Sequence, residues 1–127
     1  VIDMVSEYNI EDYVVYSSFN HDSIGLVRQL KCDADVAYLA GDYHRCMDGI
    51  SKYGGMTIHP AQWGMPVNKS NVEAIKNAGL RVRMWNGSEP LYGQLRTLPD
   101  MDLREYYRLG ATDIFTNVPE RYCENRR

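Results

Sequence analysis

Residues 70–86 read SNVEAIKNAGLRVRMWN, and this stretch decides the fold. Ser70 can cap the N-terminus of a helix, because Glu73 is placed to reach back to the cap. Gly79 ends that helix, since glycine readily adopts the left-handed conformation just past a helix end. The chain then alternates apolar residues with arginines, which is the pattern of a strand. The stretch therefore predicts a helix that leads directly into a strand.

The end of this predicted strand carries residue types suited to binding. Trp85 and Asn86 place a large aromatic ring and a side-chain amide where the strand gives way to a loop. In parallel α/β folds, ligands bind at the carboxyl ends of the strands. We therefore expect Trp85 and Asn86 to face a binding site.

The same alternation of helix and strand extends over the whole chain. Strands are expected near 13–18, 35–39, 56–59, 80–85 and 112–116, each separated from the next by a helix. This order requires a parallel sheet with crossover helices. Two architectures satisfy it, namely an open doubly wound domain and a run of five βα units from a (βα)8 barrel, whose full length is about 250 residues.

Composition limits the class of protein. The 127 residues, 44% of them hydrophobic, suit a single domain over 1–127. The net charge of −3 is not arranged in a basic stripe, so nucleic acid is not an expected partner. No apolar run approaches the roughly 20 residues of a membrane span, so we expect a soluble chain, either cytoplasmic or exported. The three cysteines, Cys32, Cys46 and Cys123, have the spacing of buried or free thiols and not of a zinc site.

Further candidate site residues lie at the ends of the first and third predicted strands. Ser18 and Phe19 follow the first strand, and Ser18 has a hydroxyl that could bond a phosphate or an alcohol. His59 ends the third strand, where barrel enzymes place functional side chains. His21 and His44 lie at the starts of helices, and we expect them to be solvated surface residues.

At these strand ends the chain resembles the C-terminal part of the glycerophosphodiester phosphodiesterase family. The family has a Ser-Phe-Asp segment before a leucine-rich helix, and later a strand that ends in proline. A helix then leads through Ala-Gly-Leu into a strand with Trp-Thr-Val-Asn. The last family motif is Gly-Val-Asp-Gly-Ile-Ile-Thr-Asp-x-Pro. The corresponding segments here are SFN at 18–20 with HDSIGLVRQL, IHP at 58–60, NVEAIKNAGLRV at 71–82 with Trp85, and GATDIFTNVP at 110–119. Three departures concern substrate contacts. Asn86 alone replaces Thr-Val-Asn, Asn117 replaces the family's Asp, and Asp113-Ile114 replaces the Asp-Gly of the last strand.

The resemblance implies a fold and an activity. The fold would be the C-terminal part of a TIM (βα)8 barrel, about five βα units with parallel strands in sequential order and with the N-terminal units missing. The intact enzyme would hydrolyse a glycerophosphodiester to an alcohol and glycerol 3-phosphate with a divalent metal, Ca or Mg. In this chain the substrate-binding residues would be Phe19, Trp85, His59, Ser18 and Asn86. Trp85 and Phe19 would lie against the glycerol or the alcohol portion of the substrate.

The family's catalytic motifs are absent from 1–127. These motifs are a His-Arg-Gly strand, a Glu-x-Asp strand, a second His followed by Asp, and a Glu-x-Lys strand, and they belong to the N-terminal part of the barrel. The resemblance therefore implies no catalytic residue and no metal ligand in this chain, and we expect it to be inactive alone. Since it opens at Val1 without an initiator methionine, we expect a piece of a longer polypeptide.

Two expectations follow for partners and for the alternative fold. Five barrel strands leave two unpaired edges, so we expect pairing with the missing N-terminal half or with a second copy. The alternative is a complete small doubly wound domain that binds a partner without catalysis. Strand order separates the two, because sequential neighbours indicate a barrel segment and a first strand in the interior indicates a doubly wound sheet.

Overall fold

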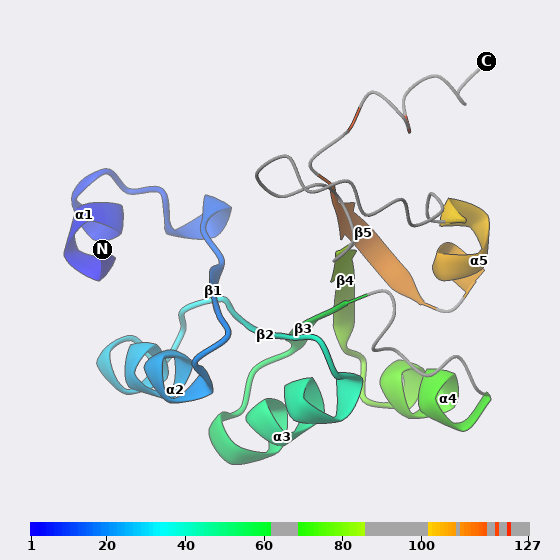
Figure 1. The fold of residues 1–127 in the computed structure, drawn as a ribbon. Coiled ribbons are helices and arrows are strands. Elements are labelled where there is room, and N and C mark those ends of the chain that lie inside the picture. Colours follow the sequence, from blue (N-terminus) through cyan, green and yellow to red (C-terminus); the bar gives the residue numbers. More distant parts are fainter. Residues whose placement is uncertain (62–68, 86–101, 109, 117–118, 120–121, 123–127) are drawn as a thin grey trace, which may run out of the picture.

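The computed structural model describes residues 1–61, 69–85, 102–108, 110–116, 119 and 122. Its strands are β1 (Tyr16–Ser18), β2 (Val36–Ala40), β3 (Thr57–Pro60), β4 (Arg81–Trp85) and β5 (Ala111–Phe115). Its helices are α1 (Ile2–Glu7), the 3-10 helix η1 (Glu11–Tyr13), α2 (His21–Leu30), α3 (Tyr43–Tyr53), α4 (Lys69–Asn77) and α5 (Leu103–Arg108). Helices α2, α3 and α4 lie together on one side of the strands (Figure 1).

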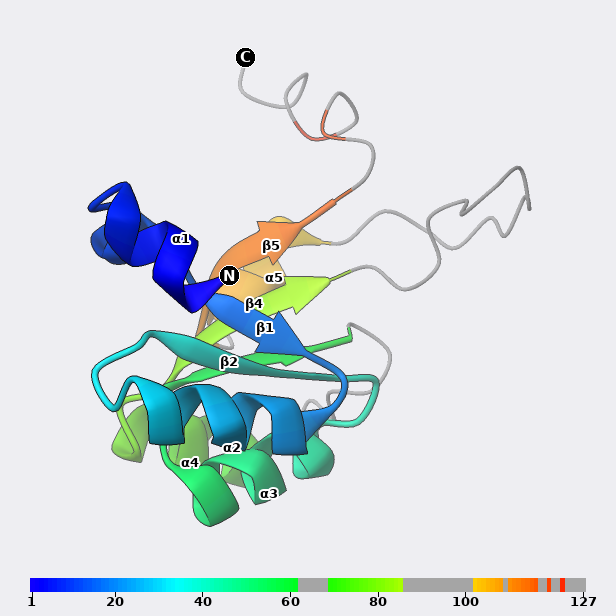
Figure 2. The same cartoon turned by 90° about the vertical axis from the view of Figure 1, so that its left-hand side faces the viewer.

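The five strands form one parallel sheet in the order β1-β2-β3-β4-β5. The sequential arrangement expected of a barrel segment is therefore confirmed. The doubly wound alternative is wrong, because β1 lies at an edge of the sheet and not in its interior. In Figure 2 the helices α2, α3 and α4 lie beneath the strands.

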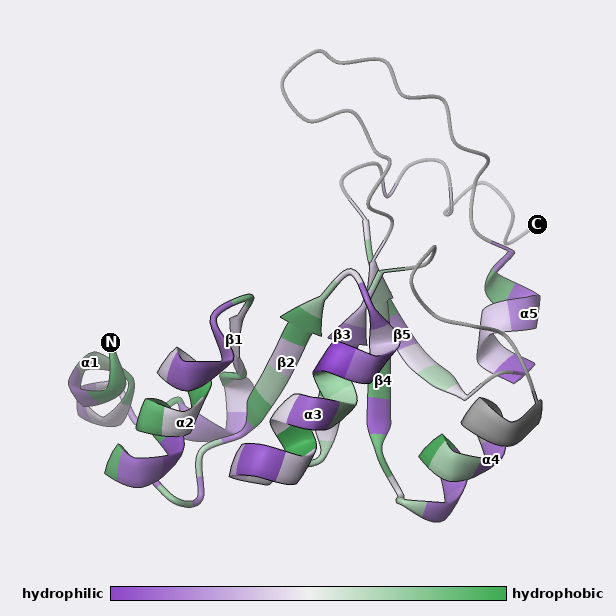
Figure 3. Ribbon diagram, turned by 60° about the horizontal axis from the view of Figure 1, so that its bottom comes forward, coloured by the Kyte–Doolittle hydropathy of each residue, from purple (hydrophilic) through white to green (hydrophobic). Residues whose placement is uncertain are grey.

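The apolar core lies between the sheet and the helices. Successive strand residues face opposite sides of a sheet, so every second residue of β2, β3 and β4 enters this core. Five of these side chains are at most 1% exposed: Val36, Tyr38, Ile58, Val82 and Met84. The ribbons of α2, α3 and α4 change repeatedly between hydrophilic and hydrophobic residues, as expected of helices with one buried side (Figure 3).

A glycine allows helix α3 to pack closely on the sheet. A Cβ atom added at Gly49 would collide with the Tyr38 ring, so the close approach of helix and strand requires glycine there. The Tyr38 hydroxyl donates a hydrogen bond of 2.6 Å to the carbonyl oxygen of Gly54. Gly54 ends the helix with a φ of 76°, a left-handed conformation that favours glycine. These contacts fix α3 across β2.

Two local expectations differ from the structure. Helix α4 begins at Lys69, so Ser70 lies inside the helix and is not its N-cap. The first strand begins at Tyr16, because the residues before it form η1 and then an extended link. Helix ends are the least certain part of a sequence-based prediction, since neighbouring polar residues can compete as caps. Gly79, by contrast, has the expected positive φ of 66° after α4.

The cysteines that the structure describes are free thiols. Cys46 is buried in the core, where its thiol donates to the carbonyl oxygen of Tyr38, and burial raises its pKa to about 12. Cys32 is exposed. Cys123 lies outside the described residues. In the described segments no helix combines the length and the apolar character that a membrane crossing requires.

Candidate functional site

Side chains from strands that are not neighbours meet on the side of the sheet away from the helices. The Phe19 ring, which follows β1, lies 5.9 Å from the Trp85 ring at the end of β4, measured between centroids. Two strands lie between β1 and β4, so a flat sheet would hold them about 14 Å apart at a strand spacing of about 4.8 Å. The sheet therefore curves as a barrel wall does, and both rings lie on its concave face.

These rings border a hollow of about 650 Å³ on the concave face. Its lining consists of Tyr13, Val15, Ser17, Phe19, Leu39, His59, Arg83, Trp85 and Phe115. Most of these side chains are aromatic or aliphatic, and the three polar ones among them are Ser17, His59 and Arg83. An apolar hollow of this size with few polar groups is typical of a site for a small molecule.

Trp85 is held in place at the rim of the hollow. Its indole Nε1 donates a hydrogen bond of 3.0 Å to the carbonyl oxygen of His59 on the neighbouring strand. The Phe19 ring meets the indole edge to face, at an interplanar angle of 86°. The hydrogen bond satisfies the polar end of the indole and leaves its apolar body as a fixed wall of the hollow.

His59 supplies a neutral imidazole at the base of the hollow. The side chain is 3% exposed, and its Nδ1 shares a hydrogen bond of 2.9 Å with the hydroxyl of Ser17. Its ring also meets the Phe115 ring at 4.9 Å between centroids. Burial, together with the smaller effect of the positive charge of Arg83, lowers the pKa of His59 to about 4. The imidazole is therefore uncharged at neutral pH.

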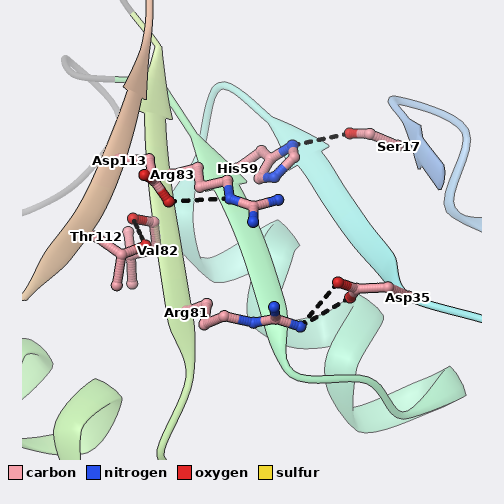
Figure 4. A network of polar contacts seen from close by, with 8 residues as sticks. All are labelled: Ser17, Asp35, His59, Arg81, Val82, Arg83, Thr112 and Asp113. Atoms are coloured by element: carbon pink, nitrogen blue, oxygen red, sulfur yellow. Dashed lines mark hydrogen bonds and ion pairs between the residues drawn. The ribbon is translucent and has the colours of Figure 1, made fainter. Parts of the chain in front are cut away.

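Two arginines of β4 form ion pairs on the same concave face (Figure 4). Arg81 donates through Nη2 to both carboxylate oxygens of Asp35, each at 2.9 Å, and so reaches across β3 to the residue just before β2. Arg83 donates through Nε to Asp113 on the adjacent β5 at 3.2 Å. Each positive charge is balanced by one carboxylate, so these two ion pairs add no net charge to the face.

The structure brings together three of the predicted site residues. Phe19, His59 and Trp85 all line the hollow, at the carboxyl ends of their strands. Ser18 does not join them, because its hydroxyl accepts a hydrogen bond from the backbone N–H of Asn20 at 3.0 Å. Asn86 lies outside the described residues. The hydroxyl next to the imidazole comes instead from the preceding serine.

Three further residues line the hollow although the sequence did not single them out as binding residues: Ser17, Arg83 and Phe115. The alternation along each strand could have found two of them, since residues two apart face the same side of a sheet. Ser17 stands two residues before Phe19, and Arg83 two residues before Trp85. Placing Phe115 needed the register of β5 against β4, which the sequence does not give.

One histidine expectation is wrong. His21 was expected to be solvated, but its Nε2 is 3.0 Å from the carbonyl oxygen of Leu39, and its ring meets the Tyr38 ring edge to face. His21 is therefore a half-buried link between α2 and β2. His44 is exposed, as expected, with its backbone N–H capped by Asp42.

The described residues do not fit a divalent metal. Among them no group of three or more His, Cys, Asp or Glu side chains is placed to hold an ion. The two carboxylates of the concave face, Asp35 and Asp113, are each paired with an arginine. A calcium or magnesium ion needs several oxygen ligands that face one another, which this part of the chain does not offer.

The geometry defines a segment of a parallel βα barrel with an aromatic hollow at the carboxyl ends of its strands. Solved structures with the same fold include a glycerophosphodiester phosphodiesterase from Parabacteroides distasonis ATCC 8503, with a TM-score of 0.71 and 21% identity over 98% of this chain and 47% of that one. A candidate glycerophosphodiester phosphodiesterase from Galdieria sulphuraria gives a TM-score of 0.72 and 17% identity, over 98% of this chain and 48% of that one. The fold is therefore that of part of a TIM barrel.

Comparison of sequences gives one curated relative. An uncharacterized protein, YqiK of Bacillus subtilis (strain 168), is 27% identical over 122 residues, which are 95% of this chain and 46% of that protein. The chain thus spans about half the length of its curated relative and of the solved structures named above. No family model matches the sequence.

Proposed function

We propose that the chain forms the C-terminal five βα units of a glycerophosphodiester phosphodiesterase barrel and supplies one wall of its substrate pocket. The observation that carries this proposal is the contact between Phe19 and Trp85 across two intervening strands. The contact requires a curved sheet and puts two predicted substrate-binding rings on one rim. The intact enzyme hydrolyses a glycerophosphodiester to an alcohol and glycerol 3-phosphate.

In this proposal the chain binds and orients the substrate, and the chemistry comes from elsewhere in the barrel. The aromatic rings of Phe19 and Trp85 cover the C–H groups of the alcohol portion and exclude water from them. His59 adds a neutral polar group at the base of the same hollow. The general acid, the general base and the divalent metal belong to the N-terminal units, which carry the family's catalytic motifs. The chain alone therefore has negligible phosphodiesterase activity.

The partner in this proposal is the remainder of the barrel. A barrel of this class closes with eight strands, and this chain supplies five, so three further strands must pair with β1 and β5. A groove of about 600 Å³ lies beside β1, and the apolar side chains of Ile24, Val27 and Leu30 form part of its lining. A second copy of the chain is the alternative partner at these edges.

A chimeric barrel tests the proposal. The N-terminal half of the Parabacteroides distasonis enzyme is fused ahead of Val1, and turnover is measured with a soluble glycerophosphodiester and a divalent metal. We expect the folded chimera to be active and the 127-residue chain to be inactive. Trp85→Ala should lower kcat/KM about tenfold or more, which corresponds to about 1.4 kcal/mol of transition-state stabilisation.

Tyr107→Ala is the matched control for this experiment. Tyr107 is 77% exposed on α5, so its removal should leave kcat/KM unchanged. A chimera that is folded by circular dichroism, yet has no activity above its buffer, would contradict the assignment to this family. Robust turnover by the isolated chain would contradict the assignment of the catalytic residues to the N-terminal half of the barrel.

A further inference from the structure

His59, which lines the hollow, has a buried ring nitrogen without a partner in the described part of the chain. His59 is 3% exposed, and its Nδ1 is engaged by Ser17, but its Nε2 has no hydrogen bond. Among the described residues, the buried hydroxyls of Tyr16 and Thr57 also lack a hydrogen-bond partner. Neither of these two residues lines the hollow. An unpaired buried polar atom is costly and marks a place where a ligand atom can bind.

Arg83 places hydrogen-bond donors in the same hollow. Its ion pair with Asp113 uses Nε, whereas a guanidinium carries five N–H donors in a fixed plane. Among the described residues the terminal amino groups of Arg83 have no hydrogen-bond partner, so they can donate to an acceptor in the hollow that Arg83 lines. Figure 4 shows the Arg83 side chain and the His59 imidazole on the same face of the sheet.

The charges around the hollow favour a neutral ligand group. Arg83 is balanced by Asp113, and the His59 imidazole is neutral because burial lowers its pKa to about 4. An anion would lose its hydration in a mostly apolar hollow without gaining a net positive charge. A cation would likewise lose its hydration without gaining a net negative charge, although the aromatic rim alone would suit one. An uncharged polar group meets neither penalty.

A hydroxyl group fits both partners. If the Ser17 hydroxyl donates to Nδ1, then Nε2 carries the proton and donates to the ligand oxygen. If Nδ1 donates to Ser17, then Nε2 accepts from the ligand hydroxyl. A hydroxyl can do either and can at the same time accept from Arg83, so the match does not depend on the histidine tautomer.

We propose that His59 and Arg83 form the polar base of a hydroxyl-binding subsite, which selects diesters whose alcohol carries several hydroxyl groups over diesters of quaternary ammonium alcohols. Phe19 and Trp85 cover the C–H surface of that alcohol, and the two polar side chains form hydrogen bonds with its hydroxyl groups. This inference rests on the proposed function, because it names the class of alcohol bound in the same hollow. It makes His59 and Arg83 specificity-determining residues.

Binding to the 127-residue chain tests the subsite without relying on catalysis. The probes are myo-inositol and choline, and the readout is the NMR signals of the His59 imidazole nitrogens and of the Trp85 indole N–H. We expect myo-inositol to shift both sets of signals and choline to shift neither. Arg83→Gln and His59→Asn should each abolish the response to myo-inositol, whereas the exposed Tyr107→Ala should keep it.

A second measurement uses the chimeric barrel. The ratio of kcat/KM for glycerophosphoinositol to that for glycerophosphocholine should fall about tenfold or more in Arg83→Gln, because the substitution removes a donor to the hydroxyl groups and leaves the negative charge of Asp113 unpaired, which favours choline. Choline binding in preference to myo-inositol, or no response of the His59 signals to either probe, would overturn the subsite. An active chimera with an unchanged ratio would also overturn it and would leave the proposed function standing.

Discussion

Acidification should destabilise the fold through His59 in particular. Its pKa is about 4 in the folded chain, against 6.5 for an ordinary histidine, because burial and the charge of Arg83 disfavour the protonated ring. Between these two values the unfolded chain binds a proton that the folded chain does not. The contribution of His59 to stability is therefore fully present above pH 6.5 and is lost as the pH falls toward 4. At about 1.4 kcal/mol per pKa unit, the loss amounts to about 3 kcal/mol.

Urea unfolding of the wild-type chain and of His59→Gln measures this contribution. The free energy of unfolding is determined at several pH values between about 4 and 8, a window set by the two pKa values. Glutamine keeps a polar side chain but cannot titrate. The carboxylates titrate in both proteins, so the difference between the two pH profiles reports the titration of His59 alone. The wild type should lose about 2 to 3 kcal/mol more than the variant on acidification. Parallel pH profiles for the two proteins would refute the burial of a neutral imidazole.

Three further predictions concern the core and the sheet edges. Gly49→Ala should lower the free energy of unfolding in urea by about 1 to 3 kcal/mol, because the added Cβ meets the Tyr38 ring. Ser51→Ala, at an exposed position of the same helix, should leave that free energy nearly unchanged. Equal stability of the two variants would argue against this packing. Met84→Ala removes a fully buried side chain and should lower the free energy of unfolding by about 2 to 5 kcal/mol. A urea unfolding midpoint equal to that of the wild type would place Met84 outside the core. In the described part of the chain no strand pairs with the outer edges of β1 and β5, so the apparent mass in light scattering should rise with protein concentration, and a constant monomer mass would contradict this.

The sequence was sufficient for the order of the strands, for β4 and for two aromatic residues at the rim of the hollow. The alternation around Val82 and Met84 predicted β4 within one residue of its observed start, because the same two side chains are fully buried against the helices. Gly79 marked the helix end, since its φ of 66° is difficult for other residues. Phe19 and Trp85 were found because parallel strands bring their carboxyl ends to one edge of the sheet.

The polar base of the hollow could not be predicted in the same way. Arg83 and Asp113 lie far apart in the chain, and only the register of β4 with β5 makes them partners. The unpaired Nε2 of His59 depends on the curvature of the sheet and on the orientation of the ring. His21 was misjudged for a similar reason, because its acceptor, the carbonyl oxygen of Leu39, belongs to the next strand.

The most direct test of the curved, sequential sheet is a nuclear Overhauser effect between the ring protons of Phe19 and the indole protons of Trp85. The two rings lie 5.9 Å apart between centroids, although β2 and β3 separate their strands. We predict a clear cross-peak between the rings in the 127-residue chain, and its disappearance in Phe19→Ala. Absence of that cross-peak from a folded chain, with Phe19 instead in contact with α3 or α4, would contradict the barrel segment and the site built on it.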